Sequence, residues 1–228
     1  MNKKATYKIK CTVCLIMSIE AEKEENNNKS LLKDLILFLQ TKEAIKIGNF
    51  TLSSGKKSKF YIDLRILQSY PKYFRISIFL FKKYIMDNIG MDNFEYICSI
   101  PTSGTIFGAS LAYELFKPHI YVRKNTKNYG TQKTFEGDFV SNSKILFIDD
   151  VITTGNSLAS SIELLRDRSI INDIIVFVDR KQGKDILKEY KLKIHKIISI
   201  SEIFEILYLN NRITEKFYCE LKNEIEKI

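Results

Sequence analysis

The chain has 228 residues, of which 45% are hydrophobic and 28% are charged, and its formal net charge is +9. These values suit one globular domain with a sizeable core and a small N-terminal addition. The charge does not indicate nucleic-acid binding, because the lysines are spread over the whole length and form no basic stripe interleaved with aromatic residues. A positive field that concentrates anionic small molecules explains it equally well.

The first 29 residues predict an N-terminal extension, and the folded domain is expected over 30–228. A basic start and the apolar run 11–19 resemble a weak signal peptide, but no small-x-small cleavage site precedes the acidic segment that follows. The run is also too short to span a bilayer, which takes about 20 residues. We therefore expect a flexible tail or an added edge strand, with 22–29 as a solvated linker, in a cytoplasmic protein without membrane association.

Four cysteines, at positions 11, 14, 98 and 219, favour a reducing compartment without a disulfide framework. Cys11 and Cys14 have the spacing of half a zinc site, but no second pair of cysteines or histidines stands at a suitable distance. His119 and His195 lie in apolar surroundings and are expected to be structural.

Beyond the extension, helical and strand patterns alternate. Ser30 can cap a first helix, and Pro71 suits the first turn of a long helix over 72–88. Strands are expected over 49–52, 60–64, 96–100, 120–122, 145–148 and 174–178, and amphipathic helices over 203–209 and 213–228. This alternation predicts an α/β fold with a parallel sheet covered on both faces.

The most informative segment is 145–157, Ile-Leu-Phe-Ile-Asp-Asp-Val-Ile-Thr-Thr-Gly-Asn-Ser. Its four leading apolar residues predict a strand buried on both faces. Asp149 and Asp150 follow at the strand's carboxyl end, where open α/β sheets place their ligand crevice. Asn156 and Ser157 can each cap a helix that begins after the glycine.

The loop of this segment is suited to a phosphate, because free backbone amides and the positive end of a helix dipole point into it. Thr153 and Thr154 add hydroxyl donors. Two carboxylates would repel that phosphate, so we expect them to face sugar hydroxyls or a divalent metal. One loop is thus predicted to bind a ribose diol and its 5′-phosphate; the alternative, a helix cap, needs a single acid.

A second cluster places Arg123, Lys124 and Lys127 within five residues, directly after a predicted strand. The residues that follow, 131–137, carry little apolar pattern and predict a mobile loop. Cations on such a loop suit a pyrophosphate that must be enclosed and then released. The alternative is a charged surface hairpin.

The segment 145–155 resembles the phosphoribosyl-pyrophosphate signature of type I phosphoribosyltransferases. The pattern R-K-x-x-K-x-Y-G at 123–130, followed by E-G, is similar to the catalytic loop of orotate phosphoribosyltransferases. That family often has His where this chain has Tyr129, and the UMP synthase form has Tyr. The segment 176–183 resembles the family's V-D-R-x-Q-G, and 99–105 corresponds to its pyrophosphate-side loop.

A further resemblance is carried by the segment 50–65, Phe-Thr-Leu-Ser-Ser-Gly-Lys-Lys-Ser-Lys-Phe-Tyr-Ile-Asp-Leu-Arg. It is similar to the family's F-x-L-K-S-G-x-x-S-P-x-Y-I-D-L-R. Ser53 stands where the family usually has a substrate-contacting Lys, and Lys56 and Lys57 are the candidates to replace it. Together the matches cover about 50–183.

The resemblance implies a type I phosphoribosyltransferase fold, in which helices flank a mostly parallel sheet beside a small N-terminal hood. It implies a glycosyltransferase that transfers ribose 5-phosphate from phosphoribosyl pyrophosphate to N1 of orotate in UMP (pyrimidine) biosynthesis. Mg²⁺ would be held mainly by the substrate. Lys127, Asp149 and Asp150 would be catalytic. The phosphoribosyl pyrophosphate site would comprise Arg123, Lys124, Lys127, Tyr129, Asp149, Asp150, Val151, Thr153, Thr154, Gly155 and Asn156; orotate would contact Thr153, Arg180 and the ring of Phe60 or Tyr61.

The resemblance also implies a homodimer with shared active sites. The chain is too short to include the decarboxylase of fused UMP synthases, so that enzyme is expected to be a separate polypeptide, with association left open. Two other functions stay open: a purine phosphoribosyltransferase, expected to lack the basic loop and the Y-I-D-L-R segment, and a non-catalytic sensor of phosphoribosyl pyrophosphate, expected to carry an output module.

Overall fold

The structure, a computed structural model, describes residues 24–51, 57–123, 134–181 and 189–226. Its main sheet has the strand order β5-β4-β3-β6-β7-β8, and all neighbours are parallel except β4 and β5. The strands of this sheet are β3 (Tyr96–Ser99), β4 (His119–Val122), β5 (Phe135–Glu136), β6 (Ser143–Ile152), β7 (Ser169–Asp179) and β8 (Lys193–Ser199). The predicted α/β class and parallel sheet are therefore confirmed.

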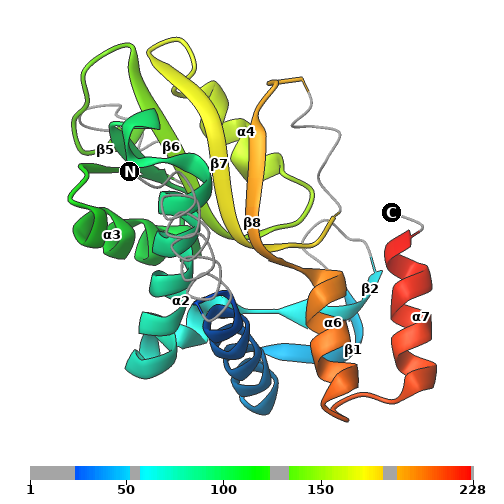
Figure 1. The fold of residues 1–228 in the computed structure, drawn as a ribbon. Coiled ribbons are helices and arrows are strands. Elements are labelled where there is room, and N and C mark those ends of the chain that lie inside the picture. Colours follow the sequence, from blue (N-terminus) through cyan, green and yellow to red (C-terminus); the bar gives the residue numbers. More distant parts are fainter. Residues whose placement is uncertain (1–23, 52–56, 124–133, 182–188, 227–228) are drawn as a thin grey trace, which may run out of the picture.

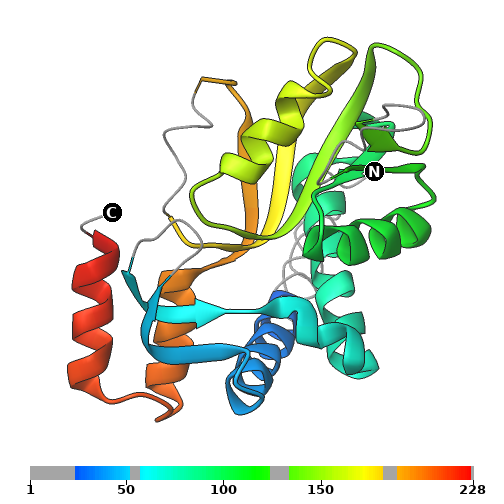
Figure 2. The same ribbon diagram turned by 180° about the vertical axis from the view of Figure 1, so that it is seen from behind.

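Helices cover both faces of this sheet (Figures 1 and 2). A first helix spans 24–41; the others are α2 (Pro71–Tyr84), α3 (Ser103–Leu115), α4 (Asn156–Glu163), α6 (Ile200–Leu209) and α7 (Glu215–Glu226). Shorter turns are η1 (Leu64–Ser69), η2 (Ile85–Ile89) and η3 (Met91–Asn93). Pro71 opens α2 as expected, since its fixed φ suits the first helical position. No helix in the described ranges is both long and apolar enough to cross a bilayer.

The middle of β6 is buried on both faces, which explains its unbroken apolar sequence. Leu146 and Ile148 belong to the core that includes α2 and α3, whereas Ile145 and Phe147 belong to the core that includes α4. This alternation follows from the period of two along a strand. Because the sheet is held on both sides, the carboxyl end of β6 is a rigid base for the residues that follow.

A separate antiparallel hairpin, β1 (Ile45–Thr51) with β2 (Lys57–Ile62), forms the hood. It lies beside α6 near the end of β8, below the main sheet in Figure 1. The ring of Phe60 on β2 meets that of Phe204 on α6 edge-on, with centroids 5.1 Å apart. The hood is thereby fixed at the edge of the sheet where β6, β7 and β8 end.

Several elements differ from the sequence expectations. The first helix already includes 24–29, which the sequence pattern assigns to a linker, so Ser30 lies inside the helix rather than at its cap. Ion pairs from Glu25 to Lys29 and from Glu24 to Lys83 support this polar turn. Strands β1 and β7 begin earlier than predicted, and β6 continues to Ile152. The sequence pattern predicts neither β8 nor β5; the prediction of a mobile loop over 131–137 is wrong at Phe135 and Glu136, which pair with β4.

Candidate active site

The two adjacent carboxylates lie near the carboxyl end of strand β6 rather than after it. Asp149 still pairs with Val176 of β7. Both acids are half-buried, and the backbone N–H of Asp150 donates to Asp149 Oδ1 at 2.9 Å. Burial, and next the neighbouring charge of Asp150, raise the pKa of Asp149 well above its usual range. Such a pair is stabilised by hydroxyl donors or by a cation.

The segment 99–105 joins β3 to α3 beside this pair. A β-carbon on Gly104 would lie 2.8 Å from Asp149 Oδ1, so only glycine allows α3 to approach so closely. The hydroxyl oxygen of Ser103, the first residue of α3, is buried and finds no hydrogen-bond partner within the described ranges. The loop that the sequence assigns to the pyrophosphate therefore borders the acid pair.

The turn after β6 leads directly into α4. Gly155 is the N-cap and adopts a left-handed conformation, with φ of 79°, which glycine reaches without steric cost. The prediction that Asn156 or Ser157 caps this helix is wrong. They are the first two residues of the helix itself. No side chain among the described residues caps α4, so its first-turn amides are oriented for an anion.

The other residues that the sequence assigns to this loop lie in the turn between β6 and α4 or at its borders. Val151, Thr153 and Thr154 are half-buried between the acid pair and α4, and Asn156 is exposed at the start of the helix. Their order along the chain places the carboxylates at one end of the turn and the helix amides at the other. A ribose 5-phosphate has the same arrangement of hydroxyls and phosphate.

Arg180 follows β7 at the same edge, and its backbone N–H donates to the carbonyl of Ile152 at 3.1 Å. Its side chain is only 3% exposed. One guanidinium nitrogen donates to Ser58 Oγ at 3.1 Å, and the group lies 4.4 Å from the centroid of the Phe60 ring. Nε has no hydrogen-bond partner among the residues that the structure describes. Burial lowers the pKa of Arg180 to about 10, which leaves it charged at neutral pH and suited to an anionic ligand.

The two aromatic candidates for stacking on a nucleobase point in opposite directions. Alternation along β2 turns Ser58 and Phe60 inward, and Phe60 is fully buried. Its ring contacts Phe204 and lies under the Arg180 guanidinium, so the prediction that it stacks on the pyrimidine is wrong: it supports the arginine instead. Tyr61, half-buried on the other face of β2, is the remaining candidate.

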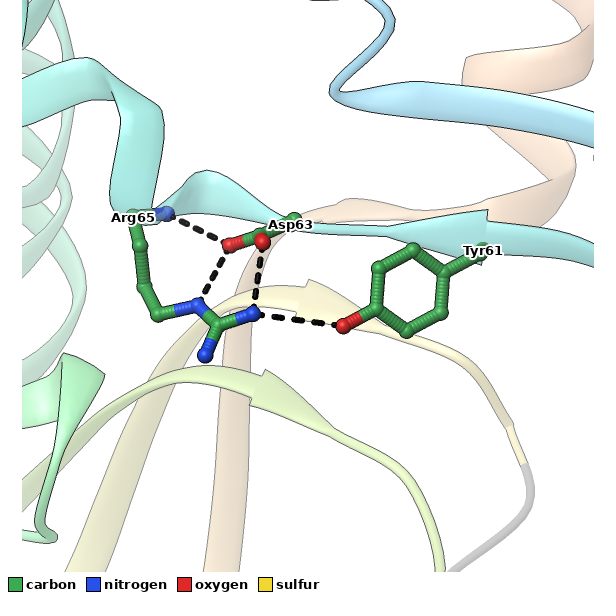
Figure 3. Close-up of polar contacts among 3 residues, drawn as sticks. All are labelled: Tyr61, Asp63 and Arg65. Carbon is green, nitrogen blue, oxygen red and sulfur yellow. Dashed lines mark hydrogen bonds and ion pairs between the residues drawn. The ribbon is translucent and has the colours of Figure 1, made fainter. Parts of the chain in front are cut away.

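Beside Tyr61 lies a polar cluster that the sequence prediction missed (Figure 3). Arg65 forms a fork with Asp63, with Nε 2.7 Å from Oδ1 and Nη2 2.6 Å from Oδ2, and Nη2 also donates to the Tyr61 hydroxyl at 3.3 Å. The hydrogen bond from Arg65 lowers the pKa of Asp63. Asp63 raises the pKa of Arg65, and Asp150 adds a smaller contribution in the same direction. The only sequence signal was the spacing Asp-x-Arg after a strand.

The basic loop is described at its two ends only. Arg123 follows β4, donates its backbone N–H to the carbonyl of Thr134 at 2.8 Å, and forms an ion pair with Glu136 of β5. Lys57, a candidate to replace the lysine missing at Ser53, is exposed at the start of β2. The remaining predicted residues Lys124, Lys127 and Tyr129, together with Ser53, Lys56, Cys11 and Cys14, lie outside the described residues.

Other ionisable groups have structural partners. His119 Nε2 lies 2.8 Å from Ser99 Oγ, and His195 Nε2 lies 2.7 Å from Asp173 Oδ1. Among the residues that the structure describes, no group of three or more His, Cys, Asp and Glu could hold a metal ion. A metal at the acid pair would therefore need further oxygen ligands from a substrate. A cation there would offset the burial and the neighbouring negative charge that raise the pKa of Asp149.

Comparison with known proteins agrees with this geometry. The model of the phosphoribosyl transferase domain matches residues 64–209. An orotate phosphoribosyltransferase of Cenarchaeum symbiosum (strain A) is 36% identical over 173 residues, which are 75% of this chain and 86% of the relative. The chain belongs to the phosphoribosyltransferase family and has its type I fold.

Solved structures narrow the assignment within that family. The orotate phosphoribosyltransferase of Aeropyrum pernix, 31% identical, superposes with a TM-score of 0.67 over 76% of this chain and 97% of its own. The UMP synthase of Leishmania donovani, 25% identical, gives 0.75 over 86% of this chain, which spans 42% of that longer chain. This chain is thus a transferase of the branch whose named members are orotate phosphoribosyltransferases.

Proposed function

We propose that the protein transfers ribose 5-phosphate from phosphoribosyl pyrophosphate to N1 of orotate, giving orotidine 5′-monophosphate and pyrophosphate for UMP biosynthesis. The observation that carries the proposal is the buried Arg180, held over Phe60 at the edge of the sheet that carries the acid pair. A guanidinium fork whose Nε is without a partner in the described part of the chain suits the carboxylate of orotate. Hypoxanthine and adenine have no carboxylate to offset the cost of its burial.

The reaction separates charge, because the sugar becomes cation-like while negative charge develops on the departing pyrophosphate. Asp149 and Asp150 accept hydrogen bonds from the ribose hydroxyls, and the first-turn amides of α4 hold the 5′-phosphate. Arg123, Lys124 and Lys127 stabilise the leaving group. Mg²⁺, when bound through substrate oxygens beside the acid pair, supplies further charge neutralisation.

At the nucleobase, Arg180 holds the carboxylate and Tyr61 covers the ring. The ring of orotate ionises readily, so its N1 needs no strong general base from the protein. The site residues therefore bind the substrates, orient them and stabilise the charge that develops in the transition state.

A steady-state assay with phosphoribosyl pyrophosphate and Mg²⁺ tests the proposed function. We expect turnover with orotate and none with hypoxanthine or adenine. The change in absorbance of the base and the release of pyrophosphate measure the turnover. Preference for a purine would establish the alternative enzyme. Binding of phosphoribosyl pyrophosphate without turnover of any base would indicate the non-catalytic sensor.

Replacing Arg180 by alanine should raise the KM for orotate and leave the affinity for phosphoribosyl pyrophosphate largely intact. Loss of one desolvated charged partner typically costs about 2–5 kcal/mol of binding free energy. Arg180→Met is the control for packing, because it keeps an apolar stem on Phe60 and removes only the charged fork. Both variants should lose orotate affinity alike; a loss confined to phosphoribosyl pyrophosphate would place Arg180 elsewhere.

We also propose that the enzyme is a homodimer with shared active sites. Association with a separate orotidine 5′-monophosphate decarboxylase is a second proposal about partners, and its support is that this chain spans only 42% of the UMP synthase that it resembles. Light scattering of the purified chain, alone and mixed with such a decarboxylase, measures both. A monomer at assay concentration would contradict the first proposal.

A further inference from the structure

Arg65 is ordered to a degree that its exposure does not explain. Its side chain is 54% exposed, yet Nε and Nη2 are both bound to Asp63 and Nη2 also reaches the Tyr61 hydroxyl. An exposed ion pair contributes little to stability, and holding a long side chain in one geometry costs entropy. The fork is therefore better explained by what it holds in place than by the fold.

The partner that gains from this order is Tyr61. The residue is on the half-buried face of β2, opposite to the inward face that carries Ser58 and Phe60. Its ring lies beside that of Phe50, with centroids 6.0 Å apart and planes tilted by 39°. In Figure 3 the guanidinium of Arg65 lies between Asp63 and the Tyr61 hydroxyl, so one side chain fixes the far end of the ring.

Tyr61 also faces the candidate site. In Figure 3 its side chain points from β2 toward the side of the main sheet where β6, which carries Asp150, and β7, which Arg180 follows, come to their ends. Under the proposed function, a base held by Arg180 is joined on this side to a ribose held by the acid pair. A ring at that position must be fixed in angle in order to stack on a pyrimidine.

We propose that Arg65, braced by Asp63, is a positioning residue that holds Tyr61 over the pyrimidine. The inference rests on the proposed function, since it takes orotate as the ligand that Tyr61 covers. Arg65 acts through Tyr61, so its loss weakens the binding of the base and leaves the ribose phosphate side unchanged.

The test compares Arg65→Gln, Arg65→Lys, Tyr61→Phe and the double variant Arg65→Gln/Tyr61→Phe. We expect Arg65→Gln and Tyr61→Phe each to raise the KM for orotate about tenfold, the size of one charge-assisted hydrogen bond. The kcat and the KM for phosphoribosyl pyrophosphate should change by less than about twofold. The double variant should be no worse than either single one, because both remove the same contact.

Two further variants sharpen the reading. Arg65→Lys should be intermediate, since one ammonium can pair with Asp63 but lacks the fork that also reaches Tyr61. Arg166→Gln is the matched control, because Arg166 is equally exposed, at 54%, and is also paired with an acid, Glu163. It removes the same charge from the protein and should leave both KM values unchanged.

Each remaining outcome overturns the inference. A raised KM for phosphoribosyl pyrophosphate would mean that Arg65 binds that substrate itself. Additive losses in the double variant would separate Arg65 from Tyr61, and a lower melting temperature with equal changes in both KM values would make the cluster structural. If the wild type is active with orotate and the variants keep its KM for orotate, this inference alone is wrong. If the wild type is inactive with orotate, the proposed function and this inference are both wrong.

Discussion

Replacing both Asp149 and Asp150 by asparagine should reduce turnover by a factor of about 10² or more, equivalent to about 3 kcal/mol of transition-state stabilisation. The carboxylates lie near the carboxyl end of strand β6, beside the loop that leads to the first-turn amides of α4. Asparagine keeps their size but removes the negative charge that the ribose and its cation-like transition state require. Turnover of orotate under saturating substrates measures the loss.

A control pair of the same charge change is available on the surface. Asp92 and Asp167 are both exposed, and Asp92→Asn/Asp167→Asn should have near-normal activity. If the folded double variant at 149 and 150 is also near normal, the acid pair has no part in the mechanism.

The single substitution Asp149→Asn should not destabilise the protein at neutral pH. The folded-state pKa of Asp149 is raised, so ionising it is harder in the folded than in the unfolded chain. The folded state therefore loses stability as the pH rises above the usual aspartate range, and Asp149→Asn avoids that loss. We expect a melting temperature equal to or above that of the wild type at pH 7, with the advantage vanishing as the pH falls below the pKa of an unfolded aspartate. A clear drop at pH 7 would contradict the raised pKa.

The acid pair could be found from the sequence because its signal is local. The strand, Asp149, Asp150 and Gly155 are contiguous, so each residue's place follows from its neighbours. The cap was assigned wrongly for a related reason. Asn156 and Ser157 have the side chains that usually cap helices, but the left-handed turn at Gly155 starts α4 one residue earlier.

Features that depend on contacts far along the chain were not predicted. Phe60 and Tyr61 are adjacent aromatics, and only the packing of β2 against α6 shows which one is covered. Strand β8 has the sequence Lys-Ile-His-Lys-Ile-Ile-Ser, which has no regular alternation of apolar and polar residues, and it lies at the edge of the sheet beside β7 alone. Arg65 stands in a recognised segment, but its fork to Asp63 and Tyr61 is a property of side-chain geometry.

Mixing two inactive variants, Lys127→Ala and Asp149→Asn, should restore activity if the sites are shared between subunits. Lys127 lies outside the described residues, but Arg123 and Thr134, which flank its segment, lie at the end of the edge pair β4 and β5, where the backbone N–H of Arg123 donates to the carbonyl of Thr134. The strand β3 separates that pair from β6 and its acids. Because the sequence between Arg123 and Thr134 is basic and has little apolar pattern of its own, we propose that it closes against the surface of a neighbouring subunit.

Random exchange of subunits gives a definite expectation. About half of the dimers are mixed, and each mixed dimer has one site that combines an intact loop with intact carboxylates, while its other site carries both lesions. Activity should therefore approach about one quarter of the wild-type value. Each variant mixed with itself is the control, and two different affinity tags show that exchange has taken place. If tagged subunits exchange and no activity returns, Lys127 acts within its own subunit, because only a loop that crosses the interface can rescue a site whose own carboxylates are intact.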